Sequence, residues 1–426
     1  MSVSVAVPTV SRYIAPRWLQ MAAAGVGNAL ETFDILVYGY LAVTLSSVFF
    51  PSHNSTVSLL LFFGTSALPY VVRPLGGAFL GAYADRRGRK KALTLSIQLM
   101  MVGTGMMALM PPFASIGMIA PIGILTARLL QAFAFSGEIG ASTAFMTEQT
   151  KARKGFYASW QAVSVNAGKM LSALFGVFLT TALSPAQLGA WGWRLPFLFA
   201  LLIGPVGLYI RRHVQETPEF LETTPVRAPV REVFSSARLR LLVGAGMNAF
   251  AMGITALFVY LPTFAVQELR LPASTVFYTL LLSPCLGVLS NLISGHISDM
   301  VGRVRVLLPV TALALLSTYP VFALLVQYKS VPVLLFAVGW LALLSGTSAS
   351  PLYALISEIF PTQIRSTGMS LSYNAGTIAF AGLAPFAFTS LVAVTGKGVA
   401  PSFYLAALAF VSMLSLIVLW HKLGLR

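Results

Sequence analysis

The sequence is poor in charged residues. Only 9% of its 426 residues are Asp, Glu, Lys or Arg, whereas soluble domains have about 25%. Hydrophobic residues make up 57%, and a soluble fold of this length could not bury that much apolar surface behind so few charges. The composition therefore excludes a soluble enzyme, a disordered chain and a secreted disulfide scaffold, and indicates an integral membrane protein.

Residues that support redox, metal or nucleophilic chemistry are also scarce. Cys285 is the single cysteine, so an intrachain disulfide is impossible. The four histidines show no metal-ligand spacing: His53, His213, His296 and His421. We find no nucleophile–base pair, no phosphate-binding loop and no nucleotide-binding domain. The sequence therefore predicts no enzyme activity, no metal site and no cofactor, and it argues against a primary pump.

Long apolar runs dominate what is present. A transmembrane helix needs about 20 mostly apolar residues, and twelve stretches qualify. They are 18–44, 57–82, 92–111, 116–146, 156–182, 194–211, 240–266, 273–299, 304–327, 331–356, 366–394 and 399–421. The first is too long for a signal peptide and carries two acidic residues, so we expect it to be retained.

A polar, proline-containing linker at 212–239 separates the first six stretches from the last six. We therefore predict an all-α polytopic membrane protein with twelve transmembrane helices. Residues 1–211 would form an amino-terminal six-helix half, and 240–426 a carboxy-terminal one.

Lys and Arg in the loops predict the orientation. With both termini cytoplasmic, the inner segments hold 21 of these residues and the outer segments 4, while Arg73, Arg128 and Lys169 lie within spans. This asymmetry follows the positive-inside rule. It accounts for the net charge of +16, so nucleic acid is not an expected partner.

The two halves share a loop pattern. Gly81-x-x-x-Asp85 is repeated 214 residues later as Gly295-x-x-x-Asp299, each followed by glycine and arginine. Internal repeats of this kind are typical of secondary transporters, whose substrate site lies near the bilayer midplane between the repeats. A second pattern is shared by the two halves: Glu148 and Glu358 are each followed by basic residues.

We predict that these loops form a latch that holds one conformation and releases in another. Glycines permit tight turns and close helix approach, and Asp85 can meet a helix N-terminus or a neighbouring arginine. The alternative is that the basic residues are topology anchors alone. The predicted latch residues are Gly81, Asp85, Arg86, Gly88, Arg89, Asp299 and Arg303.

The segment from Gly81 to Lys90 resembles the signature loop of the major facilitator superfamily. Arg128-x-x-Gln131 with Glu138 resembles that superfamily's fourth-helix motif, although Ala132 stands where glycine is usual. The resemblance implies the major facilitator fold.

Several strings also resemble the metabolite:proton symporter family. They are Gly27-Asn28-Ala29-Leu30-Glu31-Thr32-Phe33-Asp34, Arg73-Pro74-Leu75-Gly76-Gly77, Trp191-Gly192-Trp193-Arg194-Leu195-Pro196-Phe197, Glu216-Thr217-Pro218-Glu219-Phe220 and Phe360-Pro361-Thr362 through Arg365. Within that family, Lys154-Gly155-Phe156-Tyr157 and Ser159-Trp160-Gln161 look most like the citrate and tricarballylate carriers. The resemblance implies proton-coupled uptake of a small, usually anionic metabolite across a bacterial inner membrane.

Charged side chains inside the spans indicate where the substrate binds. A charge at the bilayer centre costs about 2.5–3.5 kcal/mol on insertion scales, so it should face the bundle interior. Helical spacing places all of these charges except Arg73 on polar faces of spans 1, 4 and 5, while the second half offers neutral hydrogen-bonding groups. The predicted substrate contacts are Lys169, Arg128, Arg73, Gln161, Asn166, Tyr38, Tyr373 and Asn374.

Two interpretations of these charges stay open. Arg73, Arg128 and Lys169 could bind substrate carboxylates; alternatively, Arg73 pairs with Asp34, and Arg128 with Glu31 or Glu138, as scaffolding. The predicted proton-coupling residues are Asp34, Glu31 and Glu138, because a buried carboxylate can change protonation as its surroundings change. A static salt bridge is the competing account for each.

The sequence as a whole predicts a proton-coupled symporter that imports a citrate- or tricarballylate-like anion by alternating access. Alternatives are a same-family carrier of a ketodicarboxylate, a shikimate-like acid, betaine or proline, or less favourably an exporter of drugs or metabolites. The sequence has no feature that supports a channel, a membrane enzyme or a sensor. The expected partners are the organic anion, the proton and the lipid bilayer, and we expect the monomer to function.

Overall fold

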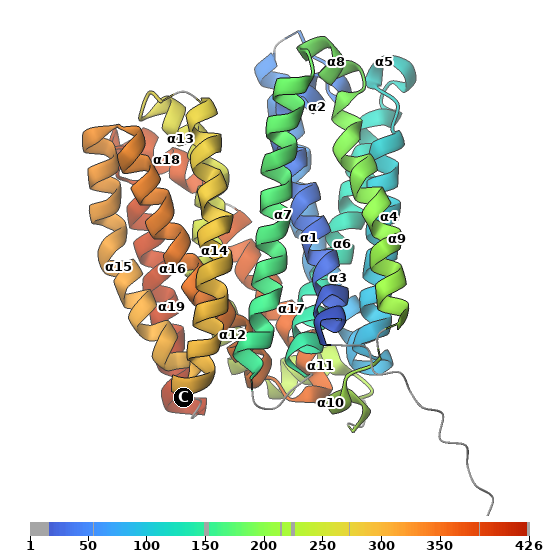
Figure 1. The fold of residues 1–426 in the computed structure, drawn as a ribbon, viewed down its shortest axis with the longest axis vertical. Coiled ribbons are helices and arrows are strands. Elements are labelled where there is room, and N and C mark those ends of the chain that lie inside the picture. The colour runs from blue at the N-terminus through green and yellow to red at the C-terminus, as the bar shows by residue number, and fades with distance from the viewer. Residues whose placement is uncertain are drawn as a thin grey trace, which may run out of the picture.

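The computed structural model describes residues 17–53, 55–148, 153–213, 215–222, 226–271, 273–382 and 384–423. Within these ranges the chain is built from helices, and the long ones stand side by side along one axis (Figure 1). The sequence prediction of an all-α protein is confirmed for this part of the chain.

The first group of helices, blue to green in Figure 1, precedes the polar linker. It consists of α1 (Arg17–Tyr40), α2 (Ala42–Phe49), α3 (Ser55–Arg87), α4 (Arg89–Leu109), α5 (Phe113–Ile116), α6 (Ile119–Thr147), α7 (Lys154–Ala182), α8 (Pro185–Ala190), η1 (Gly192–Arg194) and α9 (Leu195–His213). Phe33, Phe62, Trp193 and Phe197 lie in its own apolar core.

The second group, yellow to red in Figure 1, follows the short helices α10 (Pro218–Leu221) and α11 (Pro229–Ser236). It consists of α12 (Arg238–Met247), α13 (Ala249–Gln267), α14 (Ala273–Val301), α15 (Arg303–Tyr328), α16 (Val331–Ile359), η2 (Thr362–Ile364), α17 (Arg365–Gly376), η3 (Thr377–Gly382), α18 (Ala384–Thr395) and α19 (Pro401–Leu423). Its separate core contains Phe264, Phe322 and Phe388.

Each of the twelve predicted stretches coincides with one long helix or with helices joined end to end. Some breaks inside these stretches were not predicted: α1 gives way to α2 at Leu41, α12 gives way to α13 at Asn248, and α17 continues into the π-helical η3. Among the described residues, eight helices are long and apolar enough to cross a membrane. The count of twelve spans stays a prediction.

Two glycines set the entry to corresponding helices. Gly88 precedes α4 with φ of 103°, and Gly302 precedes α15 with φ of 102°. Side chains with a Cβ rarely adopt this left-handed region. The chain can therefore turn sharply from α3 into α4, and from α14 into α15, at the positions where the repeated loop pattern has glycine.

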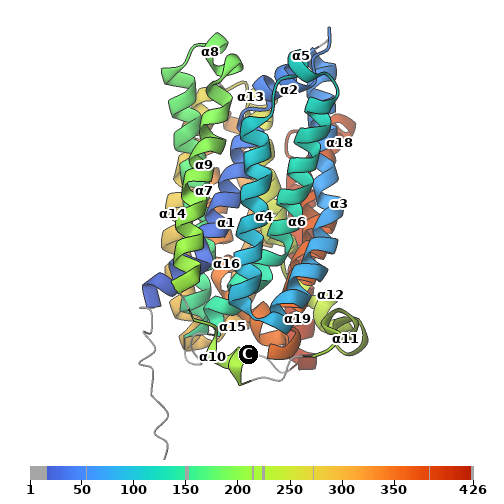
Figure 2. The ribbon, with the colours of Figure 1, turned by 90° about the vertical axis from the view of Figure 1, so that its right-hand side faces the viewer.

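The two groups meet through α7 with α14 and through α3 with α17. α10, α11 and the end of α19 lie at one end of the bundle, with the α3–α4 and α14–α15 turns; we call this the basic end (Figures 1 and 2). The opposite end carries α2, α5 and α8, and we call it the α8 end. These packed helices hold the charged residues described next.

Candidate functional site

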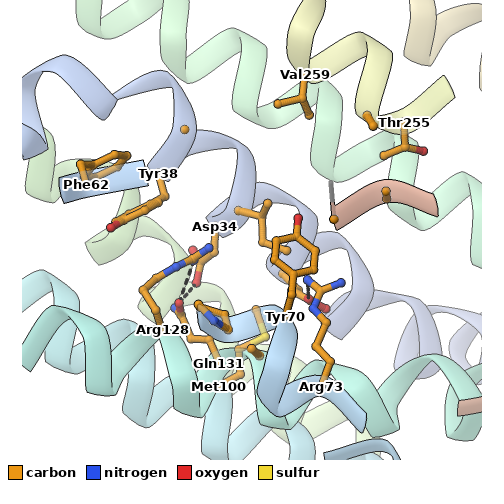
Figure 3. Close-up of a pocket in the computed structure, with 18 residues that line it drawn as sticks. Asp34, Tyr38, Phe62, Tyr70, Arg73, Met100, Arg128, Gln131, Thr255 and Val259 are labelled. Atoms are coloured by element: carbon orange, nitrogen blue, oxygen red, sulfur yellow. Dashed lines mark hydrogen bonds and ion pairs between the residues drawn. The ribbon is translucent and has the colours of Figure 1, made fainter. Parts of the chain in front are cut away.

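A cavity of about 290 Å³ lies between the two groups of helices, with α1, α3 and α6 on one side and α13 and η3 on the other (Figure 3). Ligand pockets have volumes of roughly 300–1,000 Å³, so this one suits a small metabolite. Five predicted site residues line it: Tyr38, Arg73, Arg128, Glu31 and Asp34.

Both carboxylates in the cavity are buried, at 3% exposure for Glu31 and 1% for Asp34. Glu31 lies 4.0 Å from the Arg73 guanidinium. Asp34 accepts hydrogen bonds through Oδ2 from Thr104 at 2.5 Å and from Gln131 at 2.9 Å. Burying a carboxylate without such partners is costly. Glu31 is therefore stabilised by a nearby cation, and Asp34 by hydrogen bonds from neutral side chains.

The two arginines of the cavity are held against aromatic rings. Arg128 donates to Gln131 Oε1 at 3.0 Å, and its guanidinium lies 4.4 Å from the Tyr38 ring centre. Arg73 lies between the rings of Tyr70, at 4.7 Å, and Phe135, at 4.9 Å. Cation–π contacts of this kind hold a guanidinium in place without using its hydrogen-bond donors. The alternative interpretation expected a structural ion pair between Arg73 and Asp34. That pairing is wrong, because Arg73 pairs with Glu31.

Three buried polar atoms of this cluster lack a hydrogen-bond partner among the described residues: Asp34 Oδ1, Arg73 Nε and Arg128 Nε. Unsatisfied buried groups are rare in folded proteins, and each needs an explanation such as a functional role or a bound water. Their presence in one cavity, on an acid and two bases, fits a site that receives a polar ligand or a proton.

Lys169 lies outside the lining of this cavity. The outward face of α7 is marked by Trp160, Leu174 and Phe178, which are 36%, 52% and 50% exposed. At 100° per residue, Lys169 projects roughly opposite to these side chains, toward the protein interior. Its ammonium has no hydrogen bond or ion pair to the described residues. A substrate role for Lys169 stays a prediction.

The other predicted polar residues lie in helix–helix contacts and not in the cavity. Gln161 Oε1 accepts from Asn28 at 2.8 Å and from Ser142 at 2.9 Å, which ties α7 to α1 and α6. Asn374 donates to the Ser136 carbonyl at 3.1 Å, across α17 and α6.

The remaining three candidates are placed as follows. Asn166 lies against Gly287 of α14 and donates to Ala162 in its own helix. Tyr373 packs edge-on against Phe135, with ring centres 6.4 Å apart. Glu138 is buried on α6, seven residues or about 10 Å toward the basic end from Gln131.

The repeated loop pattern forms two matching contacts at the basic end. Asp85 accepts hydrogen bonds from the backbone N–H groups of Ser366 at 3.1 Å and Thr367 at 2.8 Å, in the first turn of α17. Asp299 accepts in the same way from Gly155 and Phe156, both at 2.8 Å, in the first turn of α7. Each aspartate thus joins one group of helices to the other, and we call these contacts the two latches.

An arginine one turn later supports each aspartate. Arg89 lies 2.9 Å from Asp85, and Arg303 lies 2.6 Å from Asp299. Arg89 also donates to the Thr362 carbonyl of the second group at 2.7 Å. Arg86 instead donates to the Arg227 carbonyl. Gly81 lets α3 approach α17, because a Cβ there would come within 2.8 Å of the Thr367 Cα.

Several residues that complete the latch at the Asp85 side were not predicted from the sequence. Glu148 accepts from Arg89 at 3.0 Å and from Arg365 at 2.8 Å. Glu219 of the linker helix α10 contacts Arg365 at 2.7 Å and Lys154 at 3.2 Å. The second shared pattern could have identified this network, because it places Glu148 and Glu358 each before basic residues.

The family model described as Major Facilitator Superfamily matches residues 29–382. The chain belongs to the major facilitator superfamily. It is therefore a multi-pass membrane transporter and not an enzyme, and the sequence resemblance is confirmed.

Curated relatives match over nearly the whole chain. The citrate-proton symporter of Klebsiella pneumoniae is 34% identical over 402 residues, which cover 93% of this chain and 90% of that protein. The alpha-ketoglutarate permease of Escherichia coli (strain K12) is 32% identical, covering 94% and 93%. A glycine betaine/proline/ectoine/pipecolic acid transporter of Dickeya dadantii (strain 3937) is 30% identical, covering 93% and 81%.

Among solved structures, the proton:xylose symporter XylE bound to 6-bromo-6-deoxy-D-glucose matches with a TM-score of 0.80. The match covers 95% of both chains at 16% identity. At that identity the similarity shows the fold alone, and it confirms the predicted major facilitator fold.

Proposed function

We propose that this chain imports a small organic anion, a citrate- or tricarballylate-like di- or tricarboxylate, together with protons across a bacterial inner membrane. The observation that carries the proposal is the cluster of Arg73 and Arg128 beside Glu31 and Asp34 in a cavity between the two groups of helices. Arginines can bind a carboxylate, and a buried acid can take up and release a proton. The citrate-proton symporter relatives support this assignment.

We also propose the predicted topology: twelve spans in two six-helix halves, 1–211 and 240–426, with both termini and the basic end in the cytoplasm. The positive-inside rule supports it. In this orientation the two latches seal the cytoplasmic side of the cavity. Transport then requires both latches to open as the halves rock around the bound substrate.

Protons must accompany a polyanion for energetic reasons. Moving a negative charge inward against a negative interior costs about 2.3 kcal/mol per charge per 100 mV. Asp34 and Glu31 are the proposed proton carriers, with Arg128 next to them. More than one proton per polyanion, or uptake of a partly protonated acid, is therefore expected.

One observation weighs against the betaine alternative. A quaternary ammonium is recognised by open aromatic faces, but the rings of Tyr38 and Tyr70 are already occupied by Arg128 and Arg73. A ketodicarboxylate stays the second candidate, since the same arginines suit it.

The proposal can be tested by counterflow in proteoliposomes with a panel of labelled acids, betaine and proline. We expect exchange of citrate or tricarballylate, and accumulation when the external side is made acidic. Exchange restricted to betaine or proline would reject the carboxylate assignment.

A further inference from the structure

The two walls of the cavity differ in charge. All of its Asp, Glu, Lys and Arg residues lie on the wall of the first group of helices (Figure 3). The wall of the second group consists of Thr255, Ala256 and Val259 of α13 and the end of η3 at Ala381 and Gly382. The described lining residues on this wall therefore offer a ligand no ionisable side chain.

The neutral wall also has little hydrogen-bonding capacity to spare. The Thr255 hydroxyl donates to the Ala251 carbonyl of its own helix at 2.9 Å. Val259, one turn further along α13, is 60% exposed and borders the cavity. A group that reaches this wall therefore meets methyl groups and a hydroxyl whose proton is already used.

The charged wall can balance only a limited anionic charge. Its two arginines face two carboxylates, and Arg73 already lies 4.0 Å from Glu31. A trivalent anion placed between the walls would direct at least one ionised carboxylate at Val259. An ionised carboxylate that loses water on contact with this wall meets no cation and no side-chain hydrogen-bond donor there and is destabilised, whereas a methyl group or a protonated carboxyl is tolerated.

We propose that Thr255 and Val259 form a selectivity wall that accepts an uncharged part of the substrate. The site then takes acids with at most two ionised carboxylates, and the third substituent is a methyl, a hydroxyl or a protonated carboxyl. This inference rests on the proposed function and deepens it, because it names the ionic form of the acid and the residues that select it.

The test uses two acids of matched shape. Tricarballylate and 3-methylglutarate differ by one carboxylate, which is a methyl group in the second acid. Each is added as an unlabelled competitor in proteoliposome counterflow of a labelled acid that the chain exchanges. At neutral pH we expect 3-methylglutarate to compete at least as strongly, and mild acidification to improve tricarballylate selectively.

The variant Val259→Lys adds a cation to the neutral wall, and Val259→Met is the matched neutral control. We expect the lysine variant to shift the ratio of the two affinities about tenfold toward tricarballylate, which corresponds to one favourable charge contact, and Val259→Met to leave it unchanged. Equal ratios in both variants would overturn the proposal, and so would a wild-type preference for tricarballylate at neutral pH. The wild-type comparison decides alone if the lysine variant fails to fold.

Failure of the proposed function gives a different result. If the wild type exchanges no di- or tricarboxylate of the panel but exchanges betaine or proline, both proposals are rejected. If the wild type exchanges di- or tricarboxylates, but the ratio of the two affinities is the same in Val259→Lys and Val259→Met, the selectivity wall alone is rejected.

Discussion

Asp85 and Asp299, 214 residues apart, make the same contact at two places in the molecule. Each carboxylate accepts two backbone hydrogen bonds in the first turn of a helix from the other group. The positive end of a helix dipole favours a carboxylate there. Because the contacts are duplicated, we propose that closure of the basic end depends on two similar and separable latches.

Asp85→Asn should weaken the first latch. An amide oxygen replaces a charged acceptor, and hydrogen bonds to charged groups contribute about 1.5–3 kcal/mol each. In a cysteine-free background, spin labels at the exposed positions Lys91 and Arg305 would report the separation of the two groups. We expect a larger fraction of long distances. Glu222→Gln, at an exposed position in the linker, is the control and should leave the distances unchanged.

Gly81→Ala should open the same latch by a steric route. The new Cβ would lie 2.8 Å from the Thr367 Cα, a backbone atom that cannot turn aside. Gly105→Ala on α4 is a matched control, because the nearest atom there is a Leu201 methyl at 3.8 Å. We expect the same spin-label pair to separate in Gly81→Ala only. The control should keep or raise the melting temperature, since Ala is a better helix former than Gly by about 1 kcal/mol.

The sequence predicted the helices better than it predicted their partners. Apolar runs reveal lipid-facing and buried segments, but not backbone irregularity, so the break at Asn248 and the π-helix at Thr377–Gly382 could not be foreseen. The pattern around Asp85 indicated a helix N-terminus or a neighbouring arginine as its partner, and Asp85 contacts both. That the helix would be α17, entered at Ser366, depends on how distant segments pack.

The same limit applies to the cavity. Helical spacing put Gln161 on a polar face of α7, but that face meets Asn28 and Ser142 of neighbouring helices instead of the cavity. Local periodicity identifies a polar face and leaves open whether a ligand or another side chain covers it. Arg128 and Asp34 were easier to place, because a charge inside the membrane should face the bundle interior, but the same reasoning did not separate them from Glu138 and Lys169, which lie outside the cavity lining.

Glu219→Gln should make the stability of the protein less dependent on pH. Burial alone would raise the pKa of Glu219, but its hydrogen bond to Arg365 and the charges of Arg365 and Lys154 outweigh burial and lower this pKa. A lowered pKa in the folded state means that the contact stabilises the protein above the ordinary Glu pKa, near 4.3. The contribution is lost as the pH falls through the lowered value.

We therefore expect Glu219→Gln to lower the melting temperature at neutral pH and to match the wild type in strong acid. Thermal unfolding of purified protein across the pH range measures this difference. Glu216, whose pKa is raised by burial, titrates at higher pH and is present in both proteins, so it cancels in the comparison. A difference that persists unchanged in acid would mean that Glu219 acts through packing and not through its charge.

Asp34→Asn should separate substrate exchange from proton coupling. The asparagine keeps the shape of the side chain and an oxygen that can accept from Thr104 and Gln131, but it cannot carry a proton. We expect counterflow to continue while accumulation driven by a proton gradient is lost. Glu31→Gln tests the neighbouring acid in the same way, and proton-driven accumulation that is unchanged in both variants would reject these carriers.

Lys169→Met tests the cation that the structure leaves outside the cavity. The side chain projects opposite to the outward face of α7 and has no ion pair to the described residues, so its charge is available to a substrate carboxylate once the halves rearrange. Loss of one charge-assisted hydrogen bond of about 1.5 kcal/mol corresponds to roughly tenfold weaker apparent affinity. Leu174→Met, on the outward face of the same helix, should retain wild-type affinity. Counterflow at graded acid concentrations measures both, and an unchanged affinity in Lys169→Met would assign this lysine to the scaffold.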